Sequence, residues 1–500
     1  MCTFKHLIMN NKSNPMMRRN LIFFVLHLFL FVFIFFPVGT VKEIFAQTVD
    51  DRPNIIWIIA DDLGYGDLGS YGQKDIRTPR LDQMAKEGLR FTQFYSGHTV
   101  CAPARSSLMT GQHTGRTRVR GNQSAATGDR VPLEPDDITV AELLQQADYT
   151  TALIGKWGLG EPGTTGIPNL KGFDYFWGFL NQRRAHTFYP EWVWRNENRV
   201  ILDQNIGSFD YSTGLAVGEH DQYTHDLDMA EARQFIRANR EGPFFLYLAL
   251  QIPHAELAVP DDSLVDYLDE EGNSLFEEVP FHGSATYRPQ DKPNATYAAM
   301  VTRMDHDIGR LLDLLRKLNI EDNTLVFFTS DNGPHSEGGY DPDYFNSGGP
   351  LRGIKRDLYE GGIRVPMIVW MPGTVPAGEV SEQVWSMWDF LPTAAELAGT
   401  EPPQDIDGIS MVNALLNQPQ QDPEYLYWEF HGGVFKQAVR FGDWKAVRTD
   451  IDQPIELYDL SEDIGEEYDL ADKYPEITQQ AEEMFRTKRT PTEHWPLMID

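Results

Sequence analysis

The sequence N-I-I-W-I-I-A at residues 54–60 is followed at once by Asp61 and Asp62. An apolar run of this length is typical of a parallel strand that is buried on both faces of a sheet. Because the run ends at two acids, the strand would carry both carboxylates at its carboxyl end. We therefore predict an α/β fold around this strand, with polar chemistry where the strand ends.

Strand and helix patterns alternate along most of the chain. Further strand patterns lie at 151–154, 244–250, 325–329 and 366–370. Helical patterns lie near 82–86, 138–147, 225–239, 294–317 and 388–398. This alternation predicts a large, doubly wound, mostly parallel sheet flanked by helices. Residues 160–218 are rich in glycine, aromatic residues and arginine without a clear period, so we predict an irregular segment that covers a site.

The pattern changes near residue 425. Short alternating pieces follow one another there: YLYWEF, KQAVRF, WKAVR and IELYDL, before a last helical stretch near 475–486. These pieces predict a small antiparallel sheet with one helix. We therefore predict an α/β catalytic domain at 47–415 and a C-terminal subdomain at 416–500, connected through the polar, proline-rich stretch at 402–423.

Composition excludes several classes of protein. The chain has 500 residues, with 43 Lys and Arg against 74 Asp and Glu, a formal net charge of −31. Such an acidic chain is not a nucleic-acid binder of the basic kind. With 41% hydrophobic and 23% charged residues, it can bury a large core, which argues against disorder and coiled coil. An anionic substrate would need a locally positive pocket.

The first residues predict export. An apolar run at 21–38 follows Arg18 and Arg19, as in a signal peptide, which we place at 1–46. The run is also near the length that crosses a bilayer, so an uncleaved anchor is the alternative. We predict a periplasmic or secreted protein. Beyond this leader the chain holds a single cysteine, Cys101, which therefore has no partner for an internal disulfide.

Cys101 begins the motif C-A-P-A-R, followed by S-S-L-M-T-G at 106–111. The proline suits the first turn of a helix. Free backbone amides and the helix dipole favour an anion there, and Arg105 lies one turn further along the same face. The start of this helix could therefore hold an anionic centre. The predicted topology brings Asp61, Asp62, Lys156, His254 and Asp331 to the same end of the sheet.

The pattern C-x-P-x-R followed by S-x-x-T-G resembles the signature of the cysteine-type sulfatases, relatives of alkaline phosphatase, and the resemblance spans most of the chain after the leader. It implies that a formylglycine-generating maturation enzyme oxidises Cys101 to formylglycine (3-oxoalanine), whose hydrate supplies the nucleophile. A thiolate that attacked sulfur would leave a stable thiosulfate ester, whereas a geminal diol can expel sulfate by reforming its aldehyde.

The resemblance also implies a metal site. Asp61 and Asp62 match the family's paired metal acids, and the segment S-D-N-G at 330–333 supplies Asp331 and Asn332. The modified Cys101 would be a further ligand. Carboxylate and amide oxygens suit Ca²⁺ better than Zn²⁺, so we expect calcium. The ion would lower the pKa of one diol hydroxyl and screen the charge of the sulfate.

The segments around Lys156, His254 and Lys355 also resemble the family, and the first of them differs from the family pattern at one position. Lys156 lies in G-K-W-G-L-G, where Gly158 replaces the usual histidine of G-K-W-H-L-G. That imidazole is usually assigned to deprotonating the second diol hydroxyl, so this step lacks an assigned base. His98 and His335 are candidate substitutes, candidate sugar contacts or residues that fill a loop. Lys156 carries over as a sulfate ligand, and His254 and Lys355 as donors to the departing alkoxide.

The candidate substrate wall lies in the segment 182–195, where aromatic side chains alternate with cations such as Arg183 and His186. Such side chains either stack on sulfated sugar and pair with its anionic groups, or pack the segment onto the domain. Arg120 and Asn122 could extend the same wall. The predicted function is hydrolysis of sulfate esters of a polysaccharide or oligosaccharide. The alternatives are hydrolysis of phosphonate monoesters or phosphodiesters, and binding of sulfated glycan without turnover.

Overall fold

The computed structural model describes residues 52–207, 209–210, 215–216, 221–284 and 286–497. The predicted export signal at 1–46 lies outside these residues. Over the described ranges, no helix combines the length and the apolar character that crossing a bilayer requires.

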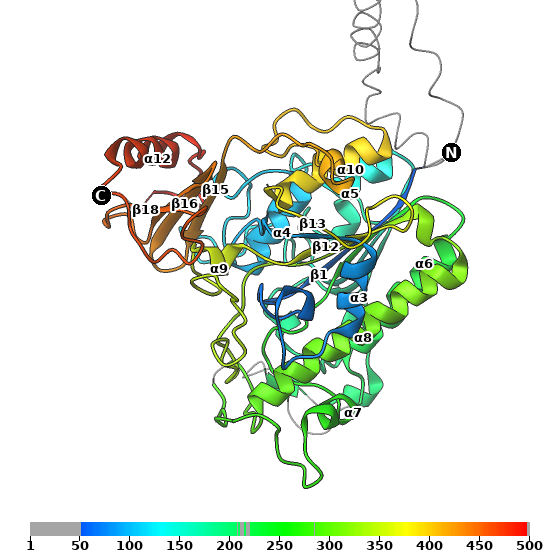
Figure 1. Cartoon of the computed structure of the whole chain (residues 1–500). Helices are drawn as coiled ribbons and strands as arrows, with labels where there is room; N and C mark the ends of the chain where they lie inside the picture. Colours follow the sequence, from blue (N-terminus) through cyan, green and yellow to red (C-terminus); the bar gives the residue numbers. More distant parts are fainter. Residues whose placement is uncertain (1–51, 208, 211–214, 217–220, 285, 498–500) are drawn as a thin grey trace, which may run out of the picture. The chain divides into compact units, whose positions relative to one another are not determined.

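A ten-stranded sheet organises the larger part of the fold (Figure 1). From one edge to the other its strands are β13 (Glu379–Ser381), β2 (Leu89–Phe91), β12 (Met367–Trp370), β11 (Thr324–Ser330), β1 (Asn54–Ala60), β10 (Phe244–Ala249), β4 (Thr150–Lys156), β5 (Tyr175–Phe179), β6 (Trp192–Arg195) and β7 (Asn198–Ile201). The neighbours from β11 to β5 are parallel, and β12, β6 and β7 pair antiparallel with the strands beside them. This confirms the predicted mostly parallel α/β sheet.

Helices cover both faces of this sheet (Figure 1). One layer consists of α3 (Pro79–Glu87), α6 (Thr224–Asn239) and α8 (Pro293–Leu318), and the other of α4 (Cys101–Thr110), α5 (Val140–Gln146) and α10 (Phe390–Ala398). Shorter helices are α7 (Asp261–Leu264), α9 (Glu360–Ile363) and α11 (Val412–Leu415). Single 3-10 turns are η1 (Gly69–Tyr71), η2 (Pro168–Leu170), η3 (Arg184–His186), η4 (Asp203–Asn205), η5 (Val265–Tyr267), η6 (Glu321–Asn323) and η7 (Met387–Asp389).

The two helical layers explain why β1 is apolar at every position after its first residue. The ring of Trp57 lies 4.1 Å, between centroids, from Phe390 of α10. Ile56 and Ile58 point the other way, into the core that includes residues of α6 and α8. The side chains of Ile56, Trp57 and Ile58 are all fully buried. Successive side chains of a strand face opposite sides, so a strand between two helical layers needs apolar residues throughout.

The C-terminal part forms a separate sheet of four antiparallel strands, as predicted. They are β15 (Leu426–His431), β16 (Phe435–Phe441), β17 (Trp444–Arg448) and β18 (Glu456–Asp459), and α12 (Pro475–Thr487) packs on one face. Trp428 shares a core with Tyr95 and Trp388 of the larger part, so the two sheets are joined by buried contacts. The domain boundary near residue 415 stays a prediction.

The segment 160–218 is more regular than its sequence suggests. It adds β5, β6 and β7 to one edge of the large sheet, besides the small pair β8 (Phe209–Asp210) and β9 (Leu215–Ala216). Another small pair joins β3 (Phe94–Tyr95) to β14 (Trp385–Ser386). Strands of four or five residues are too short to show a clear period, and aromatic residues occupy both faces here.

Candidate active site

The strands β1 and β11 place the acidic residues side by side. Ala60 and Ser330 are paired in register at the ends of these strands, so Asp61 and Asp331 leave the sheet together. Asp331 donates its backbone N–H to Ala60, and the backbone N–H of Asp62 donates to Oδ1 of Asp331 at 3.1 Å. All three carboxylates are fully buried. Burial of like charges at this spacing calls for compensating cations or a metal ion.

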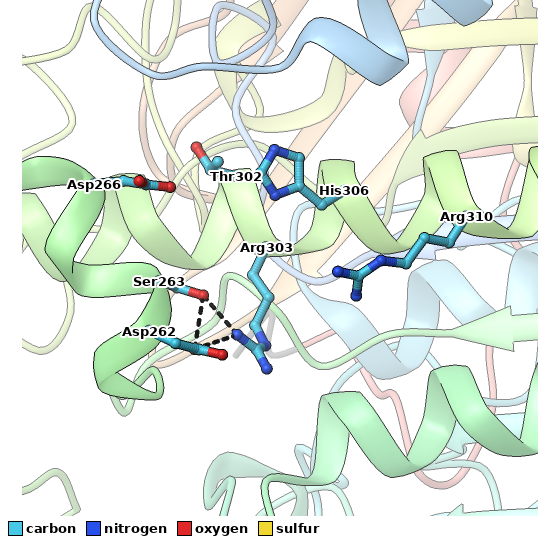
Figure 2. A pocket seen from close by; sticks show the side chains of 7 residues that line it. All are labelled: Asp262, Ser263, Asp266, Thr302, Arg303, His306 and Arg310. Atoms are coloured by element: carbon cyan, nitrogen blue, oxygen red, sulfur yellow. Dashed lines mark hydrogen bonds and ion pairs between the residues drawn. The ribbon is translucent and has the colours of Figure 1, made fainter.

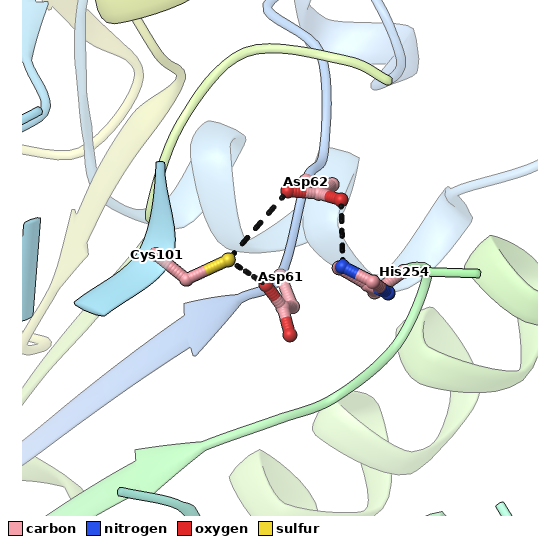
Figure 3. Close-up of side chains that lie close together, drawn as sticks. All are labelled: Asp61, Asp62, Cys101 and His254. Atoms are coloured by element: carbon pink, nitrogen blue, oxygen red, sulfur yellow. Dashed lines mark hydrogen bonds and ion pairs between the residues drawn. The ribbon is translucent and has the colours of Figure 1, made fainter. Parts of the chain in front are cut away.

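Cys101 is the first residue of α4 and points at these acids (Figure 3). Its Sγ lies 3.1 Å from Oδ1 of Asp61 and 4.0 Å from Oδ1 of Asp62. Burial, and after it the charges of Asp331 and Asp61, raise the pKa of the thiol well above its usual value. The unmodified thiol is therefore protonated and a poor nucleophile.

Each carboxylate of this cluster has a cationic partner. The pairs are Arg105 Nη2 with Asp331 Oδ2 at 2.9 Å, Lys156 Nζ with Asp61 Oδ2 at 2.5 Å, and Lys355 Nζ with Asp62 Oδ2 at 2.7 Å. Burial by itself would raise the pKa of Asp61, but Lys156, His254 and Arg105 together hold it well below its usual range. Predicted residues from six chain segments thus meet at one place, and the acids, Lys156 and His254 do so where the parallel strands end, as the topology required.

His254 follows β10 and reaches the same cluster. Its Nε2 lies 3.1 Å from Nζ of Lys355 and 3.3 Å from Oδ2 of Asp62. Burial, and then Lys355, lower the pKa of His254 to about 4. Burial alone would lower the pKa of Lys355, but Asp62 and neighbouring anions raise it well above its usual value. In this pair the lysine therefore carries the proton and the imidazole is neutral.

The donor set fits a divalent cation. Oδ1 of Asn332 is buried and has no hydrogen-bond partner among the described residues, while Nδ2 of the same amide donates to Asp62 at 2.7 Å. An orphaned buried carbonyl beside three carboxylates is typical of a site that binds a metal ion through oxygen. Burial, and then the charge of Asp61, raise the pKa of Asp331 to about 7, although Arg105 acts to lower it.

Two predicted substrate residues, His98 and Arg120, lie in the interior and contact the C-terminal sheet. His98 Nε2 is 2.7 Å from the carbonyl of Glu429 in β15, and its Nδ1 accepts the N–H of Val100 at 3.0 Å. Arg120 forms an ion pair with the carboxylate of Glu429 at 3.0 Å. Both predicted residues are fully buried. In this structure His98, which precedes α4, and Arg120, which follows it, both connect to the C-terminal sheet, and their predicted role with substrate stays a prediction.

The other three predicted substrate residues lie close to the cluster. Asn122 is exposed, and its Oδ1 accepts the N–H of Ala102 at 3.3 Å, beside Cys101. His186 is half-buried, and its ring lies 4.2 Å, between centroids, from that of His254. His335 is buried, with its ring 5.9 Å from that of His254. These contacts place the predicted residues near the cluster without testing their role.

Glu337 is a site residue that sequence reasoning missed. Its Oε2 lies 3.6 Å from Nζ of Lys355 and 3.9 Å from Nε2 of His254, and it accepts a hydrogen bond from Tyr287 at 2.7 Å. Burial alone would raise its pKa, but Lys355, His254 and other cations hold it far below its usual value. A signal was available: Glu337 follows His335 by two residues in the loop after β11.

The aromatic residues of the segment 182–195 already have partners. The indole of Trp192 lies under two guanidinium groups, with Arg184 at 3.6 Å and Arg199 at 4.2 Å from its ring centroid. Trp194 meets Trp192 edge-on at 5.4 Å. Cation–π pairs of this kind stabilise the added strands of the sheet, so for these two rings packing is the role that the structure shows.

A separate pocket lies beside α8 (Figure 2). It is lined by Asp262, Ser263, Asp266, Thr302, Arg303, His306 and Arg310. Arg303 donates to Asp262 Oδ1 at 2.7 Å and to Ser263 Oγ at 2.6 Å, so its charge is compensated within the pocket wall. None of the residues predicted for catalysis lines this pocket, and we assign it no role in the reaction.

The Glu429 cluster allows a test of stability that is separate from catalysis. We expect Glu429→Gln to lower the free energy of unfolding by about 3–5 kcal/mol, because Arg120 and Arg489 would lose their buried carboxylate partner. Calorimetric unfolding at pH 7 would measure this loss. Glu424→Gln, at an exposed position before β15, is the matched control and should change stability by less than about 0.5 kcal/mol.

The same variant has a defined pH dependence. Burial alone would raise the pKa of Glu429, but His431, Arg120 and Arg489 hold it well below the usual 4.5. A carboxyl with a depressed folded-state pKa stabilises the fold above its unfolded-state pKa and loses that contribution as the pH falls. The gap between wild type and Glu429→Gln should therefore be full at pH 7 and narrow below pH 4.5. A gap that widens in acid would contradict this account.

Fold and site together indicate an enzyme that acts on an anionic ester, because buried cations and carboxylates gather around Cys101 at the start of α4. The model of the family described as Sulfatase matches residues 53–400, and that of N-sulphoglucosamine sulphohydrolase, C-terminal, matches residues 354–490. The chain belongs to the sulfatase family, so it is a sulfuric ester hydrolase, and the predicted family is confirmed.

Named relatives agree with this assignment. The N-acetylgalactosamine-6-sulfatase of Canis lupus familiaris is 34% identical over 419 residues, which are 80% of this chain and 72% of that protein. Arylsulfatase A of Bos taurus is 32% identical over 86% of this chain and 85% of that protein. Among solved structures, that of Ps i-CgsB is 30% identical, with a TM-score of 0.73 over 89% of this chain and 95% of that chain.

Proposed function

We propose that this sulfatase removes sulfate from a sulfated carbohydrate, with formylglycine made from Cys101 and with Ca²⁺ held by Asp61, Asp62, Asp331 and Asn332. One water is consumed: R–O–SO₃⁻ and H₂O give R–OH and HSO₄⁻. The proposal includes export of the protein, on the strength of the predicted leader, and a maturation enzyme that oxidises Cys101. Its substrate partner is a polysaccharide or an oligosaccharide.

The position of Cys101 carries the proposal. Its Sγ is 3.1 Å from Oδ1 of Asp61, at the start of a helix and within a cluster of acids and bases. A structural cysteine gains nothing from such neighbours, because a buried apolar site would serve it better. An aldehyde hydrate at the same position would offer oxygen both to a metal ion and to the sulfur of a substrate.

The three acids and Asn332 are the residues that would hold the calcium ion. When bound, the ion would acidify the oxygen nucleophile and screen the negative charge of the sulfate. Arg105, Lys156 and Lys355 would then share the compensation of the buried carboxylates with the ion. These three cations would therefore be able to hydrogen-bond sulfate oxygens.

Lys355 and His254 are proposed to protonate the departing alkoxide. They come from different loops, and the 3.1 Å between Nζ and Nε2 lets a proton pass from one to the other. Glu337, 3.6 Å from Nζ of Lys355, would keep the lysine cationic and correctly placed. Arg105, which donates to Asp331 and to the carbonyl of Lys156, would hold the first turn of α4 against the strand ends.

A carbohydrate substrate is supported by the relatives. The name of the mammalian enzyme specifies a sulfated amino sugar, and a structure of Ps i-CgsB, 29% identical with a TM-score of 0.73, is in complex with k-i-k-neocarrahexaose. The half-buried His186 beside His254 gives this chain a polar side chain where a sugar would approach. We propose a sulfated sugar on this basis.

The test is a screen of desalted sulfated oligosaccharides with matured protein. Sulfate release, with product analysis that resolves the position of the lost sulfate, is the expected result, and Cys101→Ala should release none. Aryl phosphate and phosphonate esters, run in parallel, examine the alternative activity: faster turnover of these than of any sulfate ester would overturn the proposal. Tight binding of sulfated oligosaccharides without any release would instead favour a glycan-binding protein.

A further inference from the structure

Gly158 leaves a space that another side chain fills. Its φ is +83°, in the left-handed region that favours glycine. A Cβ at this position would lie 2.4 Å from Oε1 of Gln182 and 3.9 Å from Cβ of Ala102. The carboxamide of Gln182 therefore occupies the volume into which a side chain at 158 would project, and that volume borders the residue next to Cys101.

The backbone holds Gln182 firmly in this place. The loop that carries it leaves the end of β5, where the N–H of Trp157 donates to Phe179 at 2.9 Å and the N–H of Gly158 donates to Leu180 at 3.1 Å. These bonds tie the loop after β5 to the end of β4, which carries Lys156. The pairing of β4 and β5 therefore brings residue 182, two positions after Leu180, close to Gly158.

The carboxamide of Gln182 is buried without a hydrogen bond to any part of the chain that the structure describes. The residue is 3% exposed, and neither Oε1 nor Nε2 has a hydrogen-bond partner among the described residues. A buried amide left unpaired costs about 1–3 kcal/mol, and native proteins rarely retain one without a ligand or water to satisfy it. Oδ1 of Asn332, in the same site, shares this feature.

Within the described part of the chain, the amide of Gln182 is a donor that is not already used, unlike the cations of the cluster. Lys156, Arg105 and Lys355 each already donate to a carboxylate of the cluster. Nε2 of Gln182 is a donor without such an acceptor among the described residues, and the oxygens of a sulfate ester are acceptors. The neutral donor can thus receive an anion without first breaking an ion pair.

We propose that Gln182 is a further catalytic residue, whose Nε2 donates a hydrogen bond to an oxygen of the sulfate group. This inference rests on the proposed function and adds one contact between the enzyme and the sulfate group of its substrate. A carboxamide neither gains nor loses a proton near neutral pH. Gln182 therefore takes the place of the missing histidine in space, as a ligand for the sulfate, and does not take over its role as a base.

The kinetic test compares three variants of the matured full chain. Gln182→Ala should lower kcat/KM for a sulfated oligosaccharide about 10- to 100-fold, the range expected for a hydrogen bond to a charged group. Gln182→Glu, with nearly the same shape but a negative charge, should lower it further. Gln437→Ala is the matched control, because this glutamine is equally buried but donates to Tyr427 and Phe485 in the C-terminal part. The Gln437→Ala variant should be less stable to heat than wild type, and its kcat/KM should stay within about twofold of the wild-type value.

A binding measurement separates this inference from the proposed function. Titration of inorganic sulfate into Cys101→Ala by calorimetry, with Ca²⁺ present, should give a Kd about 10-fold lower than for Cys101→Ala with Gln182→Ala. The same affinity for both proteins, or full kcat/KM in Gln182→Ala, would overturn the role of Gln182. If the wild type releases no sulfate from any substrate, the proposed function fails, and the sulfate titration still decides whether Gln182 contacts the anion.

Discussion

Replacing Cys101 with alanine should reduce kcat for sulfate release by on the order of 10⁵- to 10⁶-fold, the scale on which loss of a nucleophile acts in hydrolases. The reason lies in the position of the side chain, 3.1 Å from Oδ1 of Asp61 and at the start of α4. The measurement is the initial rate of sulfate release from the best oligosaccharide of the screen, with both proteins produced alongside the maturation enzyme.

Two controls make this result specific. Thermal unfolding of Cys101→Ala should match wild type to within about 2 kcal/mol, since one buried sulfur atom is removed. Wild type produced without the maturation enzyme should be as inactive as the variant, because burial and the neighbouring acids keep its thiol protonated. An active wild-type sample whose peptide around Cys101 shows an intact thiol by mass spectrometry would refute the proposed nucleophile.

The predictable part of this site depends on local sequence. The apolar run before Asp61 identifies a buried strand, and a strand of a parallel sheet brings the residues at its carboxyl end to one edge. The same rule places Asp331, Lys156 and His254 at that edge, and the structure brings them into the cluster around Cys101. This prediction needs no knowledge of side-chain contacts, because the topology alone fixes where strand ends meet.

The unpredicted part depends on contacts between distant segments. Glu429 pairs with Arg120, 309 positions away in the chain, and no local pattern links the two. Gln182 fills the space beside Gly158 only because β5 lies next to β4 in the sheet. Strands as short as β6 are too short to show a repeating hydrophobic pattern in the sequence. The sheet edge formed by β5, β6 and β7, and with it the loop of Gln182, could therefore not be predicted either.

Removing the divalent cation should abolish turnover, and restoring Ca²⁺ should recover it. The three buried carboxylates and Oδ1 of Asn332, which has no hydrogen-bond partner within the described ranges, would supply oxygen ligands. At a free Ca²⁺ concentration of about 100 times Kd, binding should stabilise the wild type by about 2.7 kcal/mol. Chelation followed by thermal unfolding with increasing Ca²⁺ measures this directly, and sulfate release from the same samples measures the loss and recovery of activity.

Asp331→Asn tests whether the predicted residues hold that ion. The substitution keeps the shape of the side chain but removes one charged ligand. Mutating a residue that only supports a metal ligand typically weakens metal binding by roughly 10- to 100-fold. We expect the loss of a ligand to weaken Ca²⁺ binding by more than this. Asp389→Asn is the matched control. Asp389 is equally buried and burial raises its pKa to about 7, as for Asp331, but it accepts from the backbone N–H groups of Ser386 and Ile409.

The two variants separate a metal ligand from a buried acid of another kind. Both should unfold at a lower temperature than wild type without Ca²⁺, because the amide replaces one acceptor oxygen by an NH₂ group, beside Arg105 at position 331 and beside two backbone N–H groups at position 389. Only Asp331→Asn should also lose the Ca²⁺-dependent rise in stability, since Asp389 belongs to the start of α10 and not to the cluster around Cys101. If Asp331→Asn kept the full Ca²⁺ response, or if chelation left the wild type fully active, the cluster of acids at the strand ends would not be the metal site.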